Sequence, residues 1–174
     1  KAAELISAEY PEVEILLPAA ETISSEELAT RVDNYEAEVE LIEGHSYEVM
    51  ETSDLLLSTS GTATLEAAFF QTPLVIIYKT SWLSYFLAKL LVSLPHVGLP
   101  NIIAQREVVP ELLQTEADAQ TIAQEALAIL AAPTRQEEIK EDLALVWDRL
   151  GEAGAVQRVA ELVLETGGIG YEID

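Results

Sequence analysis

The chain contains no cysteine, only two histidines and only nine Lys and Arg residues among its 174 positions. Without cysteine it can form neither disulfide bonds nor thiolate metal sites. The histidines, His45 and His96, lie far apart in the sequence, so a His-based metal site is not expected. The 31 acidic residues give a net charge of −22. Nucleic-acid binding is therefore not expected, because it depends on Lys and Arg neutralising phosphates.

Long uninterrupted apolar runs are also scarce. The apolar stretch at residues 82–94 is too short for a transmembrane span and contains Lys89. It predicts a buried helix, with contact to lipid or to another domain as the alternative. The acidic excess predicts a strongly solvated surface rather than attachment to an anionic membrane, and a dedicated basic partner is the weaker alternative.

Short apolar segments alternate with helix-like segments along most of the chain. Four segments have the length and branching of buried strands: residues 13–17, 39–42, 54–58 and 74–78. Helices are predicted over residues 2–9, 24–35, 46–52 and 62–70, and three further apolar stripes at helical spacing follow residue 120. The alternation predicts an α/β fold, with a Rossmann-like parallel sheet, helices on both faces and additional C-terminal helices.

One domain is expected over residues 1–166, followed by a flexible tail at residues 167–174. The chain opens within a helix-like segment and does not begin with Met. We therefore expect it to be part of a longer protein.

An anion-binding turn is predicted where the strand at residues 54–58 meets the next helix. Ser60, Gly61 and Thr62 lie at the carboxyl end of that strand, where parallel sheets bind their ligands. Free N–H groups at the helix start favour a phosphate or diphosphate there. Glu66 shares a helical face with Thr62 and could accept hydrogen bonds from a ribose diol. The alternative is that Ser60 or Thr62 only caps the helix and Glu66 is solvated.

Polar side chains also interrupt the apolar segment at residues 99–114. Five of them could converge on one pocket: Asn101, Arg106, Glu107, Glu111 and Gln114. The planar guanidinium of Arg106 suits phosphate or carboxylate, and the amide of Asn101 suits a sugar hydroxyl or a base edge. In the alternative interpretation Arg106 forms a structural ion pair with Glu107 or Glu111, and Pro110 begins a short helix.

Two more polar residues follow predicted strands. Lys79 could neutralise a leaving diphosphate, although a solvated lysine is an equally good interpretation. His45 could contact a base or a ribose, although an ordinary loop histidine is the simpler interpretation, and His96 is expected to be structural.

Residues 60–68, the Tyr78-Lys79 pair and residues 99–114 together resemble lipid-A-disaccharide synthases. The most specific part is Pro-Asn-Ile-Ile-Ala at residues 100–104, followed by Arg-Glu-Val-Val-Pro-Glu-Leu-Leu-Gln at residues 106–114. The resemblance covers roughly residues 1–165 and implies the carboxy-terminal, UDP-sugar-binding half of a GT-B glycosyltransferase. One departure is Gln105, which stands where the family usually has glycine.

The resemblance implies a hexosyltransferase that joins UDP-2,3-diacylglucosamine to 2,3-diacylglucosamine 1-phosphate with inversion, forming the β-1,6 disaccharide of lipid A biosynthesis. It implies no metal or other cofactor, and a peripheral location at the cytoplasmic face of the inner membrane for the intact protein. The lipid acceptor and the general base belong to an amino-terminal domain that this chain lacks, so the chain alone is expected to be inactive.

The resemblance also assigns positions within the site. It places Ser60, Gly61 and Thr62 beside the diphosphate and Glu66 at the ribose. Asn101, Arg106 and Glu107 fall in the cleft, and the predicted substrate-binding set is completed by Lys79, Glu111 and Gln114. The alternatives are another UDP-sugar enzyme of the same architecture, such as a UDP-N-acetylglucosamine 2-epimerase, or a non-catalytic acidic α/β module that binds a protein.

Overall fold

The computed structural model describes the whole chain except residues 21–22, 83–84, 86–94, 152–153 and 168–174. Its helices are α1 (Ala2–Glu9), α2 (Ser25–Val32), α3 (Ser46–Thr52), α4 (Ala63–Phe70), α6 (Leu99–Ala104), α7 (Ala119–Leu130), α8 (Pro133–Arg149) and α9 (Ala155–Gly167). Its strands are β1 (Leu16–Ala19), β2 (Glu40–Glu43), β3 (Leu56–Thr59), β4 (Leu74–Tyr78) and β5 (Glu111–Leu113). Most of the helix expected at residues 82–94 lies outside the described residues, as does the expected tail except Gly167, which is the last residue of α9.

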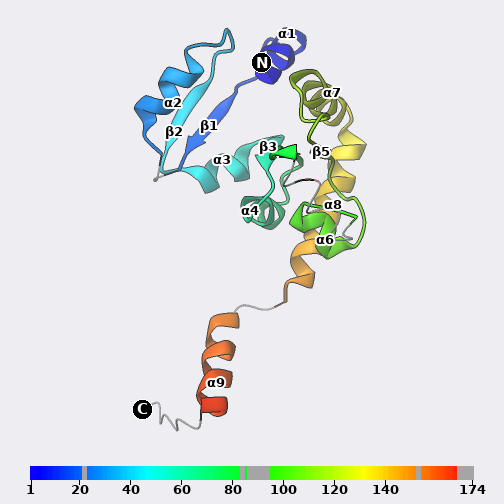
Figure 1. Ribbon diagram of the computed structural model, residues 1–174. Helices are drawn as coiled ribbons and strands as arrows, with labels where there is room; N and C mark the ends of the chain where they lie inside the picture. Colours follow the sequence, from blue (N-terminus) through cyan, green and yellow to red (C-terminus); the bar gives the residue numbers. More distant parts are fainter. Residues whose placement is uncertain (21–22, 83–84, 86–94, 152–153, 168–174) are drawn as a thin grey trace.

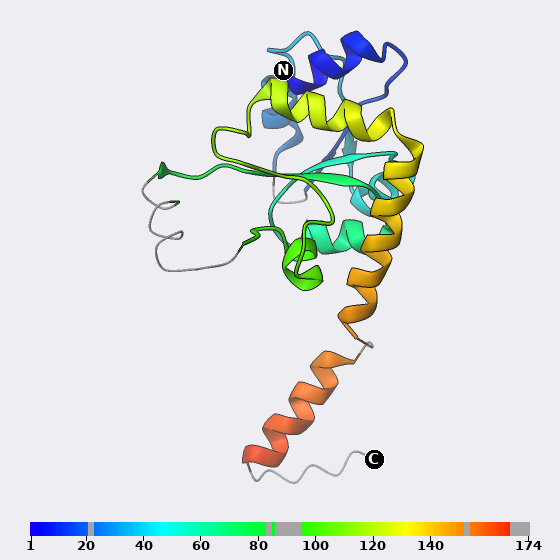
Figure 2. The same ribbon diagram turned by 90° about the vertical axis from the view of Figure 1, so that its right-hand side faces the viewer.

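The strands form parallel ladders, as the alternating pattern predicted. β1 pairs with β2, and a second sheet has the order β3-β4-β5, with every pairing between described strands parallel. Helices α1 and α7 lie on one side of this second sheet and α4 and α6 on the other, while α8 runs along its edge (Figures 1 and 2). The predicted Rossmann-like α/β fold with C-terminal helices is confirmed, although its hydrogen-bonded ladder is divided into two sheets.

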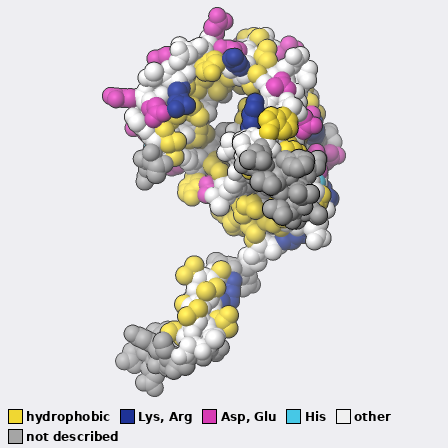
Figure 3. All heavy atoms as spheres, viewed as in Figure 1, with side chains coloured by type: hydrophobic (Ala, Val, Ile, Leu, Met, Phe, Trp, Pro, Cys, Tyr) yellow, Lys and Arg dark blue, Asp and Glu magenta, His cyan; other side chains and the backbone are white. Residues whose placement is uncertain are grey.

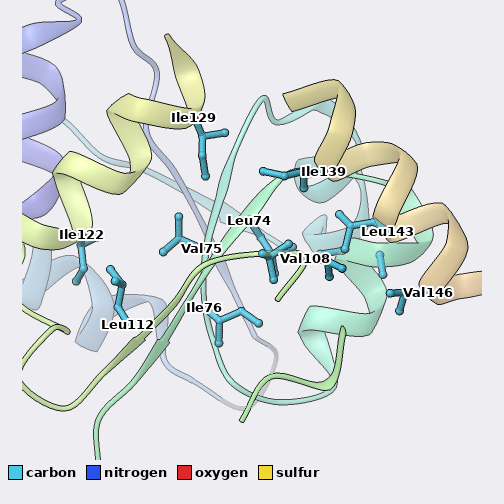
Figure 4. Close-up of a cluster of buried hydrophobic side chains, with 13 residues drawn as sticks. Leu74, Val75, Ile76, Val108, Leu112, Ile122, Ile129, Ile139, Leu143 and Val146 are labelled. Atoms are coloured by element: carbon cyan, nitrogen blue, oxygen red, sulfur yellow. The ribbon is translucent and has the colours of Figure 1, made fainter. Parts of the chain in front are cut away.

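β4 is the centre of the core because side chains pack on both of its faces. Leu74, Val75 and Ile76 are all fully buried. Successive strand residues point to opposite faces, and Figure 4 shows Val75 on the side of Ile129 in α7 and Leu74 on the side of Leu143 in α8. This two-sided burial explains the continuous apolar sequence of the strand.

Two segments differ from the sequence prediction. β1 begins later than predicted and runs through Pro18, which was expected to end it. Pro18 pairs in register with Ile42, and β1 has only β2 as a neighbour among the described strands. An edge strand tolerates proline because one of its sides needs no ladder N–H.

The second difference lies in residues 99–113, where no strand was expected and a short helix from Pro110 was one interpretation. They form α6, with Pro100 in its first turn, and then β5. The Pro110 carbonyl accepts a hydrogen bond from Ile76 N at 2.9 Å. Pro110 therefore leads into a strand rather than a helix, because its carbonyl joins the ladder beside β4.

α9 extends away from the other helices (Figures 1 and 2). Apolar side chains are exposed along it, interspersed with other atoms (Figure 3). They include Val156, Val159, Leu162 and Val163, which are each more than half exposed. Among the described residues, no helix is both long enough and apolar enough to cross a membrane.

Candidate functional site

The carboxyl ends of β3, β4 and β5 meet at one edge of the sheet, where ligands of parallel sheets bind. Ser60 N donates to Ile77 O at 3.3 Å, and Gln114 N donates to Tyr78 O at 2.9 Å. The side chain of Gln114 then accepts a hydrogen bond from Thr80 N at 2.9 Å. The sheet therefore brings the residues that follow its three strands to one edge, among them Ser60, Lys79 and Gln114.

The Ser60–Thr62 turn presents free backbone donors at this edge. Within the described part of the chain, the N–H groups of Gly61 and Thr62 make no hydrogen bond. Thr62 is the N-cap residue of α4, but its hydroxyl forms no capping hydrogen bond. A Cβ atom added at Gly61 would have no atom of these described residues within 4 Å. The turn is thus open in front of the helix N-terminus, where the helix dipole favours an anion.

Glu66 is half-buried one turn further along α4. It lines a groove of about 410 Å³ together with Thr62, so the two residues face one hollow, as their spacing predicted. The other residues that line this groove are Tyr47, Leu65, Phe69, Phe70 and Trp147.

Glu111 holds the segment before α6 against the end of β4. Its carboxylate accepts hydrogen bonds from Val97 N at 2.8 Å and Gly98 N at 2.9 Å. The Ser60 hydroxyl donates to Val97 O at 3.1 Å. A Cβ at Gly98 would lie 2.3 Å from Ile76 Cδ1, so only glycine allows this approach. Glu111 therefore positions the candidate turn indirectly, through the Val97 peptide.

Asn101 is fully buried, and the protein itself uses all of its hydrogen-bonding capacity. Its Nδ2 donates to Val109 O at 2.8 Å and to Glu111 Oε1 at 2.7 Å. Its Oδ1 accepts from Val108 N at 2.7 Å and Val109 N at 3.1 Å. Asn101 is consequently a structural residue of the α6–β5 connection, with no free donor for a sugar or a base.

Arg106 and Glu107 lie away from the turn because they precede β5, whereas Ser60 and Lys79 follow their strands. Arg106 forms a two-pronged ion pair with Asp142 of α8, including a bond from Nη1 to Oδ2 of 2.8 Å. These hydrogen bonds raise the pKa of Arg106. Arg106 therefore forms a structural ion pair, as the alternative interpretation predicted, but its partner is Asp142 rather than Glu107 or Glu111. Glu107 is exposed.

Gln114 is nearly completely buried at the candidate edge, with 6% of its surface exposed. Its Nε2 is buried and has no hydrogen-bond partner among the described residues. Leaving a buried donor unsatisfied costs about 1–3 kcal/mol. Such an atom at a ligand-binding edge indicates a position where a ligand acceptor would be favourable.

The carboxyl ends of β1 and β2 form a second hollow, of about 390 Å³. Ala19, Glu43 and Gly44 are among its lining residues. His45, which follows Gly44, is exposed and its Nδ1 lies 3.2 Å from Glu48 Oε1. The described residues contain no group of three or more acidic or histidine side chains arranged to hold a metal ion.

The sequence matches one protein family over nearly its whole length: the model of the lipid-A-disaccharide synthetase family matches residues 1–164. The chain belongs to this family. Curated lipid-A-disaccharide synthases of Syntrophus aciditrophicus and Myxococcus xanthus are each 41% identical to it over 165 residues, which cover 94% and 95% of the chain. The synthase of Nitrosococcus oceani is 41% identical over 164 residues.

These matches cover only 43%, 43% and 42% of the three relatives' own lengths. The chain therefore spans less than half the length of these lipid-A-disaccharide synthases.

Family membership bears on Gln105, which closes α6. Its φ is 58°, in the left-handed region, which glycine adopts without steric cost. The glycine that the resemblance led us to expect at this position would thus suit the backbone conformation. In this chain a glutamine adopts the left-handed conformation at that position.

The aromatic lining of the groove beside Glu66 was not expected from the sequence. Phe69 packs edge-on against Trp147, with ring centroids 4.9 Å apart. Both side chains remain substantially exposed, at 52% and 41%. The adjacent pair Phe69-Phe70 at the end of a short helix was the available sequence signal, but the partner Trp147 comes from a distant helix.

Proposed function

We propose that this chain is the donor-binding half of a lipid-A-disaccharide synthase, which holds UDP-2,3-diacylglucosamine during transfer to 2,3-diacylglucosamine 1-phosphate. The observation that carries this proposal is the open turn at Gly61 and Thr62. The N–H groups of these two residues bond to none of the residues that the structure describes, and they lie at the N-terminus of α4, at the edge where β3, β4 and β5 end. Helix N-termini of this kind are suited to phosphate groups.

The diphosphate is proposed to bind at residues 60–62, with Lys79 and Gln114 nearby on the same edge. Lys79 is exposed where β4 ends, and Gln114 Nε2 is a buried donor that a phosphate oxygen could satisfy. Fixed donors of this kind stabilise the negative charge that develops on a leaving diphosphate without reorganisation. This would support transfer of the sugar without a metal ion.

Glu66 is proposed to bind the ribose. A carboxylate can accept hydrogen bonds from both hydroxyls of the diol. The shared hollow of Thr62 and Glu66 supports this arrangement, since it places the acceptor one helical turn from the proposed phosphate site. Asn101 and Glu111 have a supporting role, because they fix the segment to which the Ser60 hydroxyl is bonded.

The acceptor and the general base are proposed to belong to the part of the relatives that this chain does not match. The chain alone should accordingly bind UDP without catalysing transfer. The intact protein is proposed to act at the surface of the inner membrane, where its lipid substrates reside.

Calorimetric titration with UDP and with ADP tests the donor site. We expect UDP to bind more tightly than ADP, and Gly61→Ala to weaken UDP binding about tenfold or more. The added methyl group has no atom of the described residues within 4 Å, so a loss of affinity would report on the ligand rather than on the fold. Arg106→Ala is a suitable control because Arg106 is held by Asp142. Unchanged affinity in Gly61→Ala would refute the proposed position of the diphosphate.

A further inference from the structure

The two sheets of the chain have unpaired edges on facing sides. β1 lies on the β3 side of its own sheet, with β2 on the outer side (Figure 1). Among the described strands β1 has only β2 as a partner, and β3 has only β4. An opening separates the two parts of the molecule in the space-filling view (Figure 3). We call the space between β1 and β3 the inter-sheet gap.

The edge of β3 at this gap carries backbone donors that no ladder uses. Leu56 N donates to Pro73 O at 2.8 Å, so the backbone of Leu56 is directed toward β4. Successive residues of a strand direct their N–H groups to opposite sides. The N–H groups of Leu57 and Thr59 therefore face the gap, and within the described part of the chain they make no hydrogen bond.

The edge of β1 is free in the same way. Glu40 N donates to Ile15 O at 2.9 Å, and Glu40 is in register with Leu16. The backbone of Leu16 therefore points away from β2, toward the gap. Pro18 follows on this side near the end of the strand, where it can offer only its carbonyl because proline has no N–H. A ladder on this edge would thus begin at Leu16 and lose one bond at its end.

Side chains beside the gap are less covered than those at the centre of the sheet. Leu57 is 42% exposed, and Leu16 and Leu17 are only partly buried. In contrast, Leu74 and Ile76 of β4, which has a strand on each side, are fully buried. Parallel sheets of α/β proteins are normally buried on both faces. Apolar side chains of a further strand would supply the missing contacts.

We propose that an apolar strand from a part of the intact protein outside this chain inserts into the inter-sheet gap, pairs in parallel with β1 and β3, and joins the two sheets into one. More than half of the intact protein lies outside the matched region, since the match covers 43% of the synthase of Syntrophus aciditrophicus. We assign the strand to the segment immediately before α1. A strand followed by α1 and β1 would form a βαβ unit, in which a crossover helix joins parallel strands.

The order of strands along the chain would reverse at this position. From the inserted strand the chain would pass to β1 and β2 on one side and then return to β3, β4 and β5 on the other. Parallel α/β sheets bind ligands outside the carboxyl ends of the strands where the order reverses. The Ser60–Thr62 turn follows β3 and would lie beside this reversal. Residues that follow the inserted strand would accordingly complete the candidate site.

A strand from a second copy of the chain is a less suitable occupant. Each copy carries a net charge of −22, and close approach of two such surfaces is opposed by their repulsion. The described strands of a second copy are also already held in ladders of their own. A segment of the same molecule needs neither approach nor release, because its linkage to α1 gives it a high effective concentration at the gap.

Extension of the chain tests the proposal directly. We would place before Lys1 the roughly 12 residues that precede the matched region in the Syntrophus aciditrophicus synthase, enough for a strand of usual length and its turn. Hydrogen exchange followed by NMR should show the Leu57 and Thr59 amides slowed at least about tenfold more than the Leu56 amide, which is already bonded to Pro73. The matched control is the same extension with its central strand residues replaced by proline, which cannot complete the ladder.

A side-chain substitution gives a second readout. Leu57→Ser should lower the folding equilibrium constant about fivefold more in the extended chain than in the original chain, because the inserted strand would bury the exposed part of Leu57. Leu145→Ser is the matched control, since Leu145 is a 55% exposed leucine of α8 rather than of the sheet. Its effect should be the same in both chains. Urea unfolding followed by circular dichroism measures each equilibrium.

The outcomes distinguish the possible partners of the two edges. Unchanged exchange of the Leu16 and Leu57 amides in the extended chain would refute the inserted strand. Protection of both amides in the original chain would also refute it: β1 and β3 would then pair directly, or with a second copy if the protection rises with protein concentration. Neither measurement uses a nucleotide, so this inference and the proposed function succeed or fail independently.

Discussion

The close approach of Gly98 to Ile76 leads to a specific prediction for the segment before α6, which supports the candidate turn. Gly98 has φ of −77° and ψ of 134°, a conformation open to any residue. Gly98→Ala therefore introduces no backbone strain, and its effect should come from packing alone. The new Cβ would lie 2.3 Å from Ile76 Cδ1, whereas carbon atoms in contact are normally about 3.5–4.0 Å apart.

The cost of Gly98→Ala follows from the surroundings of Ile76. Ile76 is fully buried at the centre of β4, so its terminal methyl cannot move aside into solvent. Overpacking of this kind costs about 1–3 kcal/mol. At the middle of that range the midpoint of thermal unfolding should fall by about 4–8 °C.

A double-mutant cycle isolates the contact. Ile76→Val removes Cδ1 and should alone cost about 0.5–1.5 kcal/mol. In the Gly98→Ala/Ile76→Val protein the contact with Cδ1 is gone, although the added Cβ still lies 3.0 Å from Glu111 Oε1. The double variant should therefore be about 1 kcal/mol more stable than the sum of the two single effects. Urea unfolding followed by circular dichroism measures each free energy. Gly61→Ala is the control glycine substitution, since its Cβ meets nothing. Additive effects in the cycle would refute the packing argument.

Three further predictions concern stability. Asn101→Ala should cost about 2–4 kcal/mol in urea unfolding, because it leaves the buried N–H groups of Val108 and Val109 without their acceptor. Gln105→Gly should raise the free energy of unfolding by about 1 kcal/mol, since φ is 58° there, whereas Gln105→Ala should not. Hydrogen bonds from the Thr121 hydroxyl and the backbone lower the pKa of Asp118. Its stabilising contribution is therefore complete above the unfolded-state pKa and is lost as the pH falls below about 4, so Asp118→Ala should destabilise at pH 7 and have less effect at pH 3.

The parallel α/β fold could be predicted from the sequence because strand and helix periods alternate clearly. The continuous apolar run of β4 and the polar turn at residues 60–62 are local patterns, and each fell close to its predicted place. The prediction was wrong at Pro18, which lies within β1, and at Pro110, which precedes β5 rather than a helix. A proline fits into a strand only where its position needs no N–H to bond a neighbouring strand. Which positions these are depends on how the strands are arranged in the folded sheet.

The candidate site was predicted only in part, for a related reason. Residues that follow parallel strands necessarily share an edge, so the proximity of Ser60 and Lys79 followed from the predicted topology. Gln114 joins them because it follows β5, a strand that was not predicted from the sequence. Arg106 was different, because its partner Asp142 lies on α8, 36 residues further along the chain. A sequence lists the charges that could pair with an arginine but does not rank them, and nearby Glu107 and Glu111 were the obvious candidates.

The strongly acidic composition does not conflict with the proposed anion site, because the two effects act over different distances. At physiological ionic strength the Debye length is about 8 Å, so surface carboxylates farther away than this are largely screened. A phosphate at the turn would instead meet the N–H groups of Gly61 and Thr62 at hydrogen-bonding distance, where screening is weak.

The net charge of −22 should then slow the approach of UDP at low salt more than it weakens the bound state. Stopped-flow measurements should show an association rate that rises with salt while the dissociation rate stays nearly constant. The opposite pattern, with association slowed by salt, would mean that a local cluster of basic side chains attracts the ligand, and the backbone turn would not be the principal anion site.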